Sequence, residues 1–158
     1  MLNEQTVTIL SALKLHGMAR GFTERLADTA QADLSHAEFV ALLVQDEKTH
    51  RDNQRLKRLL KNARLRQQAA VEDINYAHPR GLNKQVVLEL SNTQWIAAHR
   101  TVLISGPTGI GKSFIACALG NLAARAGYTV LYARAPTLFE SLQQARGDGT
   151  HLKAITKL

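Results

Sequence analysis

The fold class is indicated most directly by residues 101–113, which read T-V-L-I-S-G-P-T-G-I-G-K-S. The first five form a short apolar, β-branched run, long enough for a buried strand. The next eight, Gly106 to Ser113, match G-x-x-x-x-G-K-[ST] at every fixed position. An alanine- and leucine-rich segment follows as far as Gly127 and is typical of a helix. Strand, glycine-rich loop and helix in this order predict a phosphate-binding loop.

The residue types in this loop suit phosphate chemistry. Glycines permit a turn in which successive backbone N–H groups face inward, and a helix beginning near Gly111 adds its positive end. Lys112 supplies a cation for β- and γ-phosphates, and the Ser113 hydroxyl is a ligand type that Mg²⁺ prefers. We predict a site for a nucleoside triphosphate with Mg²⁺, with Ser113 as the metal ligand; the alternative is a glycine-rich turn with a chance lysine. The predicted nucleotide-binding residues are Gly106, Pro107, Thr108, Gly109, Ile110, Gly111, Lys112 and Ser113.

The segments around the loop predict an α/β fold. A helix is expected around Val86, Val87 and Leu90, and a second strand over residues 128–132. Pro136 suits the first turn of another helix, and a last short helix is expected over 151–158.

The first seventy residues predict helices alone. Apolar residues recur at helical spacing up to Leu13, and Gly17 is a plausible stop; a short second helix is expected over 23–30. Ser35 and Glu38 have the spacing of a capping box. A long helix is therefore expected over about 36–69, where no Gly or Pro interrupts the pattern.

Positive charge is concentrated on that helix. Residues 48–66 contain eight basic side chains and one acid, Asp52, and so carry the whole net charge of +7. Leu56, Leu59, Leu60 and Ala63 form an apolar stripe with basic flanks. We predict sequence-independent binding to the backbone of duplex DNA; the alternative is a solvated amphipathic face. The predicted DNA-binding residues are Lys48, Arg51, Arg55, Lys57, Arg58, Lys61, Arg64 and Arg66.

Composition excludes several other classes of protein. The 158 residues are 45% hydrophobic and 21% charged, as in ordinary globular proteins, and no apolar run approaches a membrane span. The N-terminus lacks the pattern of a secretory signal. The single cysteine, Cys117, has no disulfide partner, and the six histidines lack metal-ligand spacing. We expect a cytoplasmic protein without a membrane partner.

Several motifs together resemble the IstB-like proteins, ATP-binding helpers encoded beside the transposase in bacterial insertion sequences. The chain shares with them L-x-x-L-x-L-x-G-M-A at residues 10–19, the basic helix, E-D-I-x-Y-x-x-P-R-G-L at 72–82, Trp95-Ile96 and the phosphate loop. The resemblance spans the whole chain. It implies the AAA+ class of phosphate-loop NTPases with a parallel sheet, ATPase activity, the transposase of the same element as a partner, and homo-oligomers. DnaC-type helicase loaders are relatives in this class.

One departure from that family concerns hydrolysis. Family members continue with a strand ending in acidic residues that organise Mg²⁺ and water, and no such acidic pair occurs here. The resemblance also implies that the strand before the loop pairs with later strands. We therefore expect a truncated copy or fragment, with a helical basic domain over 1–70, a linker over 71–82 and a partial ATP-binding domain over 83–158. No catalytic residue is assigned.

Three functions remain open at this point. The first is an ATP-binding transposition helper with impaired hydrolysis. The second is a helicase-loader-like ATPase, which the motifs do not separate from the first. The third is a non-enzymatic DNA-binding or interaction fragment with a vestigial phosphate loop.

Overall fold

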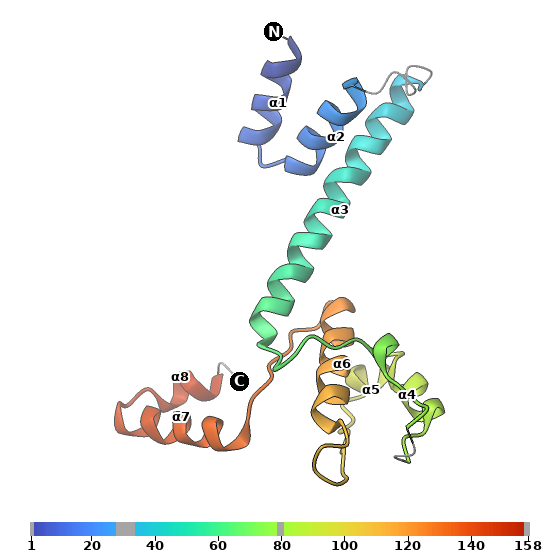
Figure 1. Ribbon diagram of the computed structural model, residues 1–158. Coiled ribbons are helices and arrows are strands. Elements are labelled where there is room, and N and C mark those ends of the chain that lie inside the picture. The colour runs from blue at the N-terminus through green and yellow to red at the C-terminus, as the bar shows by residue number, and fades with distance from the viewer. Residues whose placement is uncertain (1, 28–33, 79–80, 157–158) are drawn as a thin grey trace. The chain divides into compact units, whose positions relative to one another are not determined.

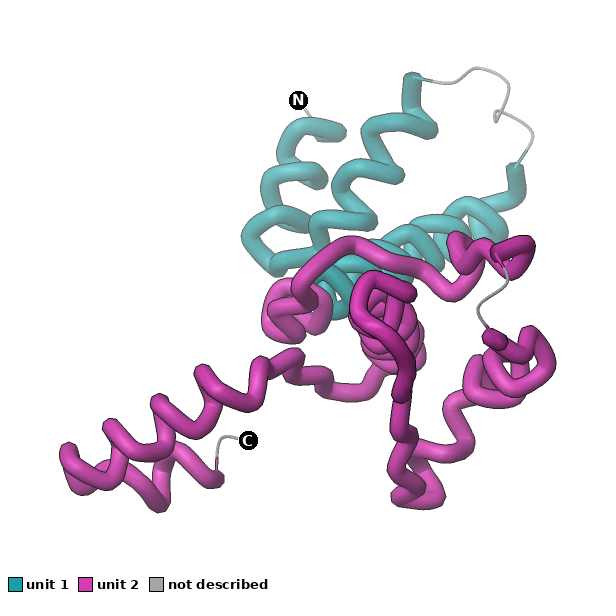
Figure 2. The backbone as a smooth tube through the Cα atoms, turned by 60° about the horizontal axis from the view of Figure 1, so that its bottom comes forward, with its two compact units in different colours: residues 1–57 teal, residues 58–158 magenta. Residues whose placement is uncertain are grey.

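The described part of the chain consists of helices joined by turns and extended segments (Figure 1). The computed structural model describes residues 2–27, 34–78 and 81–156. The chain divides into two units, residues 1–57 and 58–158, and the division falls within helix α3 (His36–Ala63) (Figure 2). Each unit is described separately below.

The expected α/β fold with a parallel sheet is wrong for this structure. Residues 101–105 and 128–132, both predicted strands, are extended, but no β-ladder occurs anywhere in the described ranges. A strand is stable only when its backbone N–H and C=O groups pair with a neighbour. The two segments do not pair with each other, and Leu103 is 91% exposed rather than buried. The Tyr132 N–H instead donates to the carbonyl of Ala63, at 2.8 Å.

Helix α3 begins at the predicted capping box and ends earlier than predicted. The Ser35 hydroxyl accepts from the Glu38 N–H at 3.3 Å, and the Glu38 carboxylate accepts from the Ser35 N–H at 2.9 Å. Hydrogen bonds from the Ser35 hydroxyl and N–H lower the pKa of Glu38. The helix ends at Ala63 because Arg64 adopts a left-handed conformation with φ of 50°. The expected extension to residue 69 is therefore wrong.

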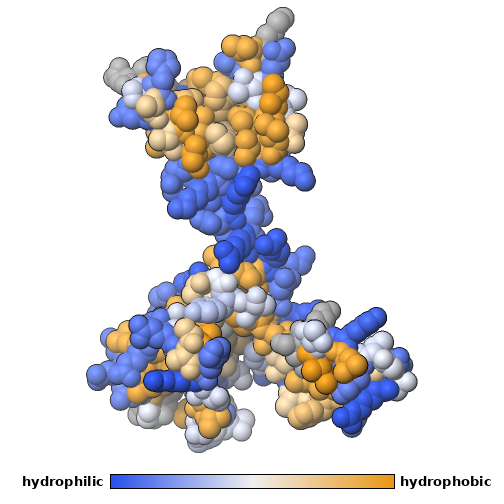
Figure 3. Space-filling view, turned by 180° about the vertical axis from the view of Figure 1, so that it is seen from behind, coloured by the Kyte–Doolittle hydropathy of each residue, from blue (hydrophilic) through white to orange (hydrophobic). Residues whose placement is uncertain are grey.

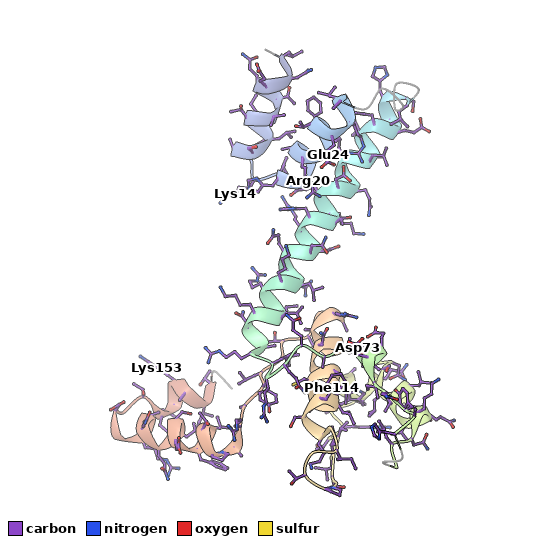
Figure 4. All side chains as sticks on the ribbon, in the orientation of Figure 1. Lys14, Arg20, Glu24, Asp73, Phe114 and Lys153 are labelled. Atoms are coloured by element: carbon purple, nitrogen blue, oxygen red, sulfur yellow. The ribbon has the colours of Figure 1, made fainter. Side chains whose placement is uncertain are left out.

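The first unit also contains α1 (Leu2–Ala12) and α2 (His16–Ala27). Lys14, at φ 59°, makes the turn between them, so Gly17 is not the predicted stop but lies inside α2. A Cβ at Gly17 would lie 2.6 Å from the carbonyl oxygen of Asp46 and 2.7 Å from the Cα of Glu47. Gly17 is required because α3 passes too close for any side chain. On the exposed side of α2, Arg20 and Glu24 form an ion pair at 3.5 Å (Figure 4).

Two adjacent acids of α3 hold α2 in place. The Glu47 carboxylate, 6% exposed as a residue, accepts from the N–H groups of Gly17 at 2.8 Å and Met18 at 3.2 Å. Asp46 forms an ion pair with Arg25, whose guanidinium also donates to the Gly21 carbonyl. Because Glu47 is buried and accepts hydrogen bonds from the N–H groups at the start of α2, docking of α2 depends on the ionised Glu47 carboxylate.

This dependence predicts acid sensitivity in the first unit. Burial raises the pKa of Glu47, but hydrogen bonds from Arg51, Met18 and Gly17 outweigh it, so the pKa lies below the ordinary 4.5. A carboxyl with a lowered folded-state pKa stabilises the fold above its unfolded pKa, and this contribution is lost as pH falls through the folded value. We expect the Tm of the wild type to fall as pH drops below 4.5, and Glu47→Gln to show a shallower fall. Thermal unfolding followed by circular dichroism measures this, and parallel curves for the two proteins would contradict it.

The second unit is built around α6 (Lys112–Arg125). Cys117 and Ala118 on this helix are fully buried, and they form a core with Ala69, Ile74 and Val87. Phe114 on the first turn of α6 packs against the same core (Figure 4). Arg125, at the other end, forms an ion pair with Glu72 in the 3₁₀ turn η2 (Val71–Asp73) at 3.2 Å. The core therefore fixes the helix that follows the glycine-rich loop.

Shorter helices complete the second unit. They are α4 (Lys84–Leu90), α5 (Gln94–Ala97), α7 (Ala135–Gly147) and α8 (His151–Thr156). Pro136 lies in the first turn of α7, as predicted. The Trp95 indole N–H donates to the Leu90 carbonyl at 2.9 Å, which joins α5 to α4. Within the described ranges, no helix combines the length and apolar character that crossing a membrane requires.

Candidate nucleotide-binding site

The predicted phosphate loop leads directly into α6. Three glycines shape it, with φ of 147° at Gly106, 84° at Gly109 and 99° at Gly111. Gly111 is the N-cap of α6, and Lys112 is the first residue of that helix. Residues with a Cβ rarely adopt such positive φ values, so Gly109 and Gly111 permit a turn that other residues would strain. A glycine turn and a helix start thus occur at the predicted positions, whereas the predicted strand before them is absent from the described residues.

The backbone at the start of α6 carries several unused donors. In the described part of the chain, the N–H groups of Gly109, Gly111, Lys112 and Ser113 donate no hydrogen bond. The first N–H groups of any helix lack partners inside that helix, and the helix dipole makes this end positive. Residues 105–109 are exposed, and Gly111 to Ser113 are half-buried. The donors are therefore grouped at a site that solvent and an anion can reach.

The Lys112 side chain folds back across the loop. Its Nζ donates to the carbonyl of Gly106 at 2.7 Å and to the carbonyl of Pro107 at 2.6 Å. These bonds hold the ammonium against the first residues of the loop. An ammonium has three donors, so one remains after the two carbonyl contacts. The Lys112 ammonium thus lies against the backbone of the loop that precedes α6.

The side chain in the loop that the sequence predicts as a metal ligand is the Ser113 hydroxyl. Across the residues that the structure describes, no three His, Cys, Asp or Glu side chains gather closely enough to hold a metal ion. A hydroxyl oxygen fits Mg²⁺, which commonly takes one or two protein ligands and the rest from phosphates and water. The residues present therefore fit a metal that arrives with a nucleotide.

The predicted DNA-binding residues lie along and just beyond α3. All eight basic side chains are exposed, and the leucines of the apolar stripe are half-buried. The helix carries Lys48 to Lys61, whereas Arg64 and Arg66 follow its end and do not continue its flank. The part of α3 that carries the cations from Lys48 to Lys61 is hydrophilic on the face seen in Figure 3. Arg51 alone of the eight has an acidic partner among the described residues, Glu47.

The chain matches a known protein family over most of its length. Residues 8–158 match the family described as IstB-like ATP binding protein. The chain belongs to this family. It is 47% identical over 159 residues to y4uH of Sinorhizobium fredii, described as an insertion sequence ATP-binding protein, with 98% of this chain and 64% of that protein covered. A second protein of that organism, y4pL, with the same description, is 42% identical over 153 residues, with 97% and 62% covered.

A relative from another genus is also described as an insertion-sequence ATP-binding protein. The ATP-binding protein of insertion sequence IS1162 from Pseudomonas fluorescens is 39% identical over 159 residues, with 100% of this chain and 69% of that protein covered. The chain thus spans less than two thirds of the length of the two Sinorhizobium relatives.

Sequence reasoning missed Glu47. Its spacing of four residues from Arg51 on a predicted helix is a signal of an ion pair. Its other partners, Gly17 and Met18, belong to the G-M-A motif of the IstB-like family but lie about thirty positions away in the chain. No local pattern connects them, and the contact is apparent only in the folded unit.

Proposed function

We propose that this chain binds ATP together with Mg²⁺ through the loop Gly106–Ser113 and acts as a helper protein of insertion-sequence transposition. The observation that carries the proposal is the group of four unused N–H donors beside the Lys112 ammonium. Concentrated donors and a mobile cation favour a polyphosphate over a neutral ligand. Family membership and the descriptions of the relatives support ATP as the ligand.

Each group has a distinct task in this proposal. The N–H groups of Gly109, Gly111 and Lys112 donate to phosphate oxygens and fix their position. The Lys112 ammonium exchanges its contacts with the Gly106 and Pro107 carbonyls for a contact with phosphate. Ser113 would hold Mg²⁺, which when bound supplies charge neutralisation between phosphate oxygens.

The metal requirement can be tested at Ser113. We expect Mg²⁺ to tighten binding of a fluorescent ATP analogue to the wild type, and Ser113→Ala to lose most of that gain because the hydroxyl ligand is removed. Ser105→Ala, an exposed serine just before the loop, is the matched control and keeps the gain. Titrations with Mg²⁺ and with a chelator measure it. Equal Mg²⁺ dependence in wild type and Ser113→Ala would contradict the assignment.

Hydrolysis by residues 1–158 is expected to be negligible. Phosphoryl transfer depends on positioned metal, water and charge, and no pair of adjacent acidic residues follows the loop in residues 114–158 to organise them. Phosphate release from the purified chain, compared with Lys112→Ala as a blank, measures the rate. Robust release that depends on Lys112 would overturn this part of the proposal.

The second activity in the proposal is sequence-independent binding of duplex DNA by residues 48–66. Seven of the eight exposed cations have no acidic partner in the described ranges, so they are available to phosphates. Few Asn or Gln residues accompany them to read base edges. A protein that holds both ATP and DNA suits a helper of the transposase, and the relatives' descriptions as insertion-sequence proteins support that partner.

A further inference from the structure

The Glu47 carboxylate uses both of its oxygens for different purposes. Oε2 accepts from the N–H groups of Gly17 and Met18, at 2.8 and 3.2 Å. Oε1 accepts from Nε of Arg51 at 2.7 Å. The Glu47 side chain is 9% exposed, whereas that of Arg51 is 62% exposed. One buried acid therefore joins the start of α2 to a surface arginine of the basic segment.

We infer that Glu47 is a positioning residue for DNA binding, which holds the Arg51 guanidinium so that its outer edge meets a phosphate. The inference rests on the proposed DNA binding by residues 48–66. A guanidinium has five donors in a rigid plane, and the bond through Nε leaves the two Nη groups free to grip phosphate oxygens. Neither Nη has a partner among the described residues.

Fixing the orientation of Arg51 favours binding because a long side chain otherwise loses rotamer freedom when it contacts DNA. Arg55 and Arg58 have no acidic partner within the described ranges, so DNA must order them. Arg51 is already ordered, and a contact through it costs less entropy. The opposing effect is the negative charge of Glu47, which weakens attraction for phosphate.

That charge is shared with other groups around the carboxylate. The donors at the start of α2 face it, together with the positive end of that helix. Other titratable groups nearby are His50, whose ring lies 6.1 Å from that of His16, and the Asp46–Arg25 pair. The Glu47 charge is therefore partly offset by the donors of α2, so it weakens the attraction of Arg51 for phosphate less. In this inference, the gain from orienting Arg51 is the larger effect.

The inference is tested by whether removing an acidic charge strengthens or weakens duplex binding. Simple electrostatics predicts that removing any acid near the basic segment tightens DNA binding. We expect Glu47→Gln to weaken binding to a duplex about fivefold, because the amide keeps only one acceptor oxygen, which cannot hold both the α2 N–H groups and Arg51. The matched control is Asp52→Asn, an exposed acid in the same segment without a partner among the described residues, which should tighten binding. Fluorescence anisotropy with the full chain and a labelled duplex measures both.

Two further variants separate positioning from folding. Arg51→Lys keeps the charge and can still pair with Glu47, but it offers no planar outer edge; we expect a loss of about fivefold, against almost none for Arg55→Lys. Gly21→Ala places a Cβ against the Asp46–Arg25 pair, which loosens α2 but leaves Glu47, its donors Gly17 and Met18, and the Glu47–Arg51 pair in place. Duplex affinity within about twofold of wild type is expected for Gly21→Ala, despite a lower Tm.

The outcomes are distinguishable. If the wild type shows no salt-dependent duplex binding, the proposed DNA binding fails, and the positioning role fails with it. If the wild type binds and Glu47→Gln binds more tightly, as Asp52→Asn does, only the positioning role is overturned. It is also overturned if Gly21→Ala weakens binding as much as Glu47→Gln, because the effect is then one of folding. Weaker binding in Glu47→Gln and Arg51→Lys, with tighter binding in Asp52→Asn, supports it.

Discussion

Lys112→Ala is expected to weaken ATP binding about ten- to a hundredfold. The variant removes the one cation of the loop, and a charge-assisted hydrogen bond of this kind contributes ~1.5–3 kcal/mol. The unused N–H groups of Gly109, Gly111 and Ser113 remain, so weak phosphate binding should persist. Titration with a fluorescent ATP analogue measures the change.

The control for this variant is another lysine. Lys153 on α8 is exposed and far along the sequence from the loop, so Lys153→Ala removes the same charge without touching the site. We expect it to bind ATP as the wild type does. Equal affinity for wild type and Lys112→Ala would show that the loop does not hold phosphate through this ammonium.

Replacing Arg51, Arg55 and Arg58 together with alanine is expected to weaken duplex binding roughly a hundredfold at low salt, because each arginine–phosphate pair contributes ~1 kcal/mol. Each phosphate that the variant no longer neutralises also lowers the log–log slope of affinity against salt by ~0.9, because fewer counterions are released. The effect should be alike for duplexes of unrelated sequence, since bonds to phosphate carry no base information. A salt titration of duplex binding measures slope and affinity together.

A matched triple variant separates position from net charge. Arg100, Arg134 and Lys153 are exposed cations outside the basic segment, and their replacement with alanine removes the same total charge. We expect that control to lose much less affinity and to keep its slope. If both triple variants behave alike, the basic segment of α3 is a solvated face and DNA binding depends only on overall charge.

The loop was predictable from the sequence because its conformation is local. The loop motif includes the glycines at 106, 109 and 111, and all three adopt the positive φ that such a turn requires. The position of Lys112 at the start of α6 follows from the same spacing. The capping box at Ser35 is equally local, and its hydrogen bonds occur between the predicted atoms.

The fold was less predictable because strands and helix ends depend on distant partners. Residues 101–105 have the composition of a strand, but composition cannot supply the neighbour that a ladder needs. Helix α3 ends at Ala63, although residues 64–69 contain no Gly or Pro, because Arg64 adopts a left-handed conformation that no local signal indicates. A glycine such as Gly17 is typical of a helix end, yet Gly17 lies inside α2. It is required there because α3 passes too close for a side chain.

The central claim, that the loop at the start of α6 holds a nucleoside triphosphate, is tested most directly by competition. A fluorescent ATP analogue bound to the wild-type chain with Mg²⁺ is displaced with ATP, ADP or AMP. If the N–H groups and Lys112 hold the outer phosphates, ATP and ADP should displace the analogue far more effectively than AMP, which lacks those phosphates. Absence of saturable binding, or equal displacement by AMP and ATP, would contradict the account.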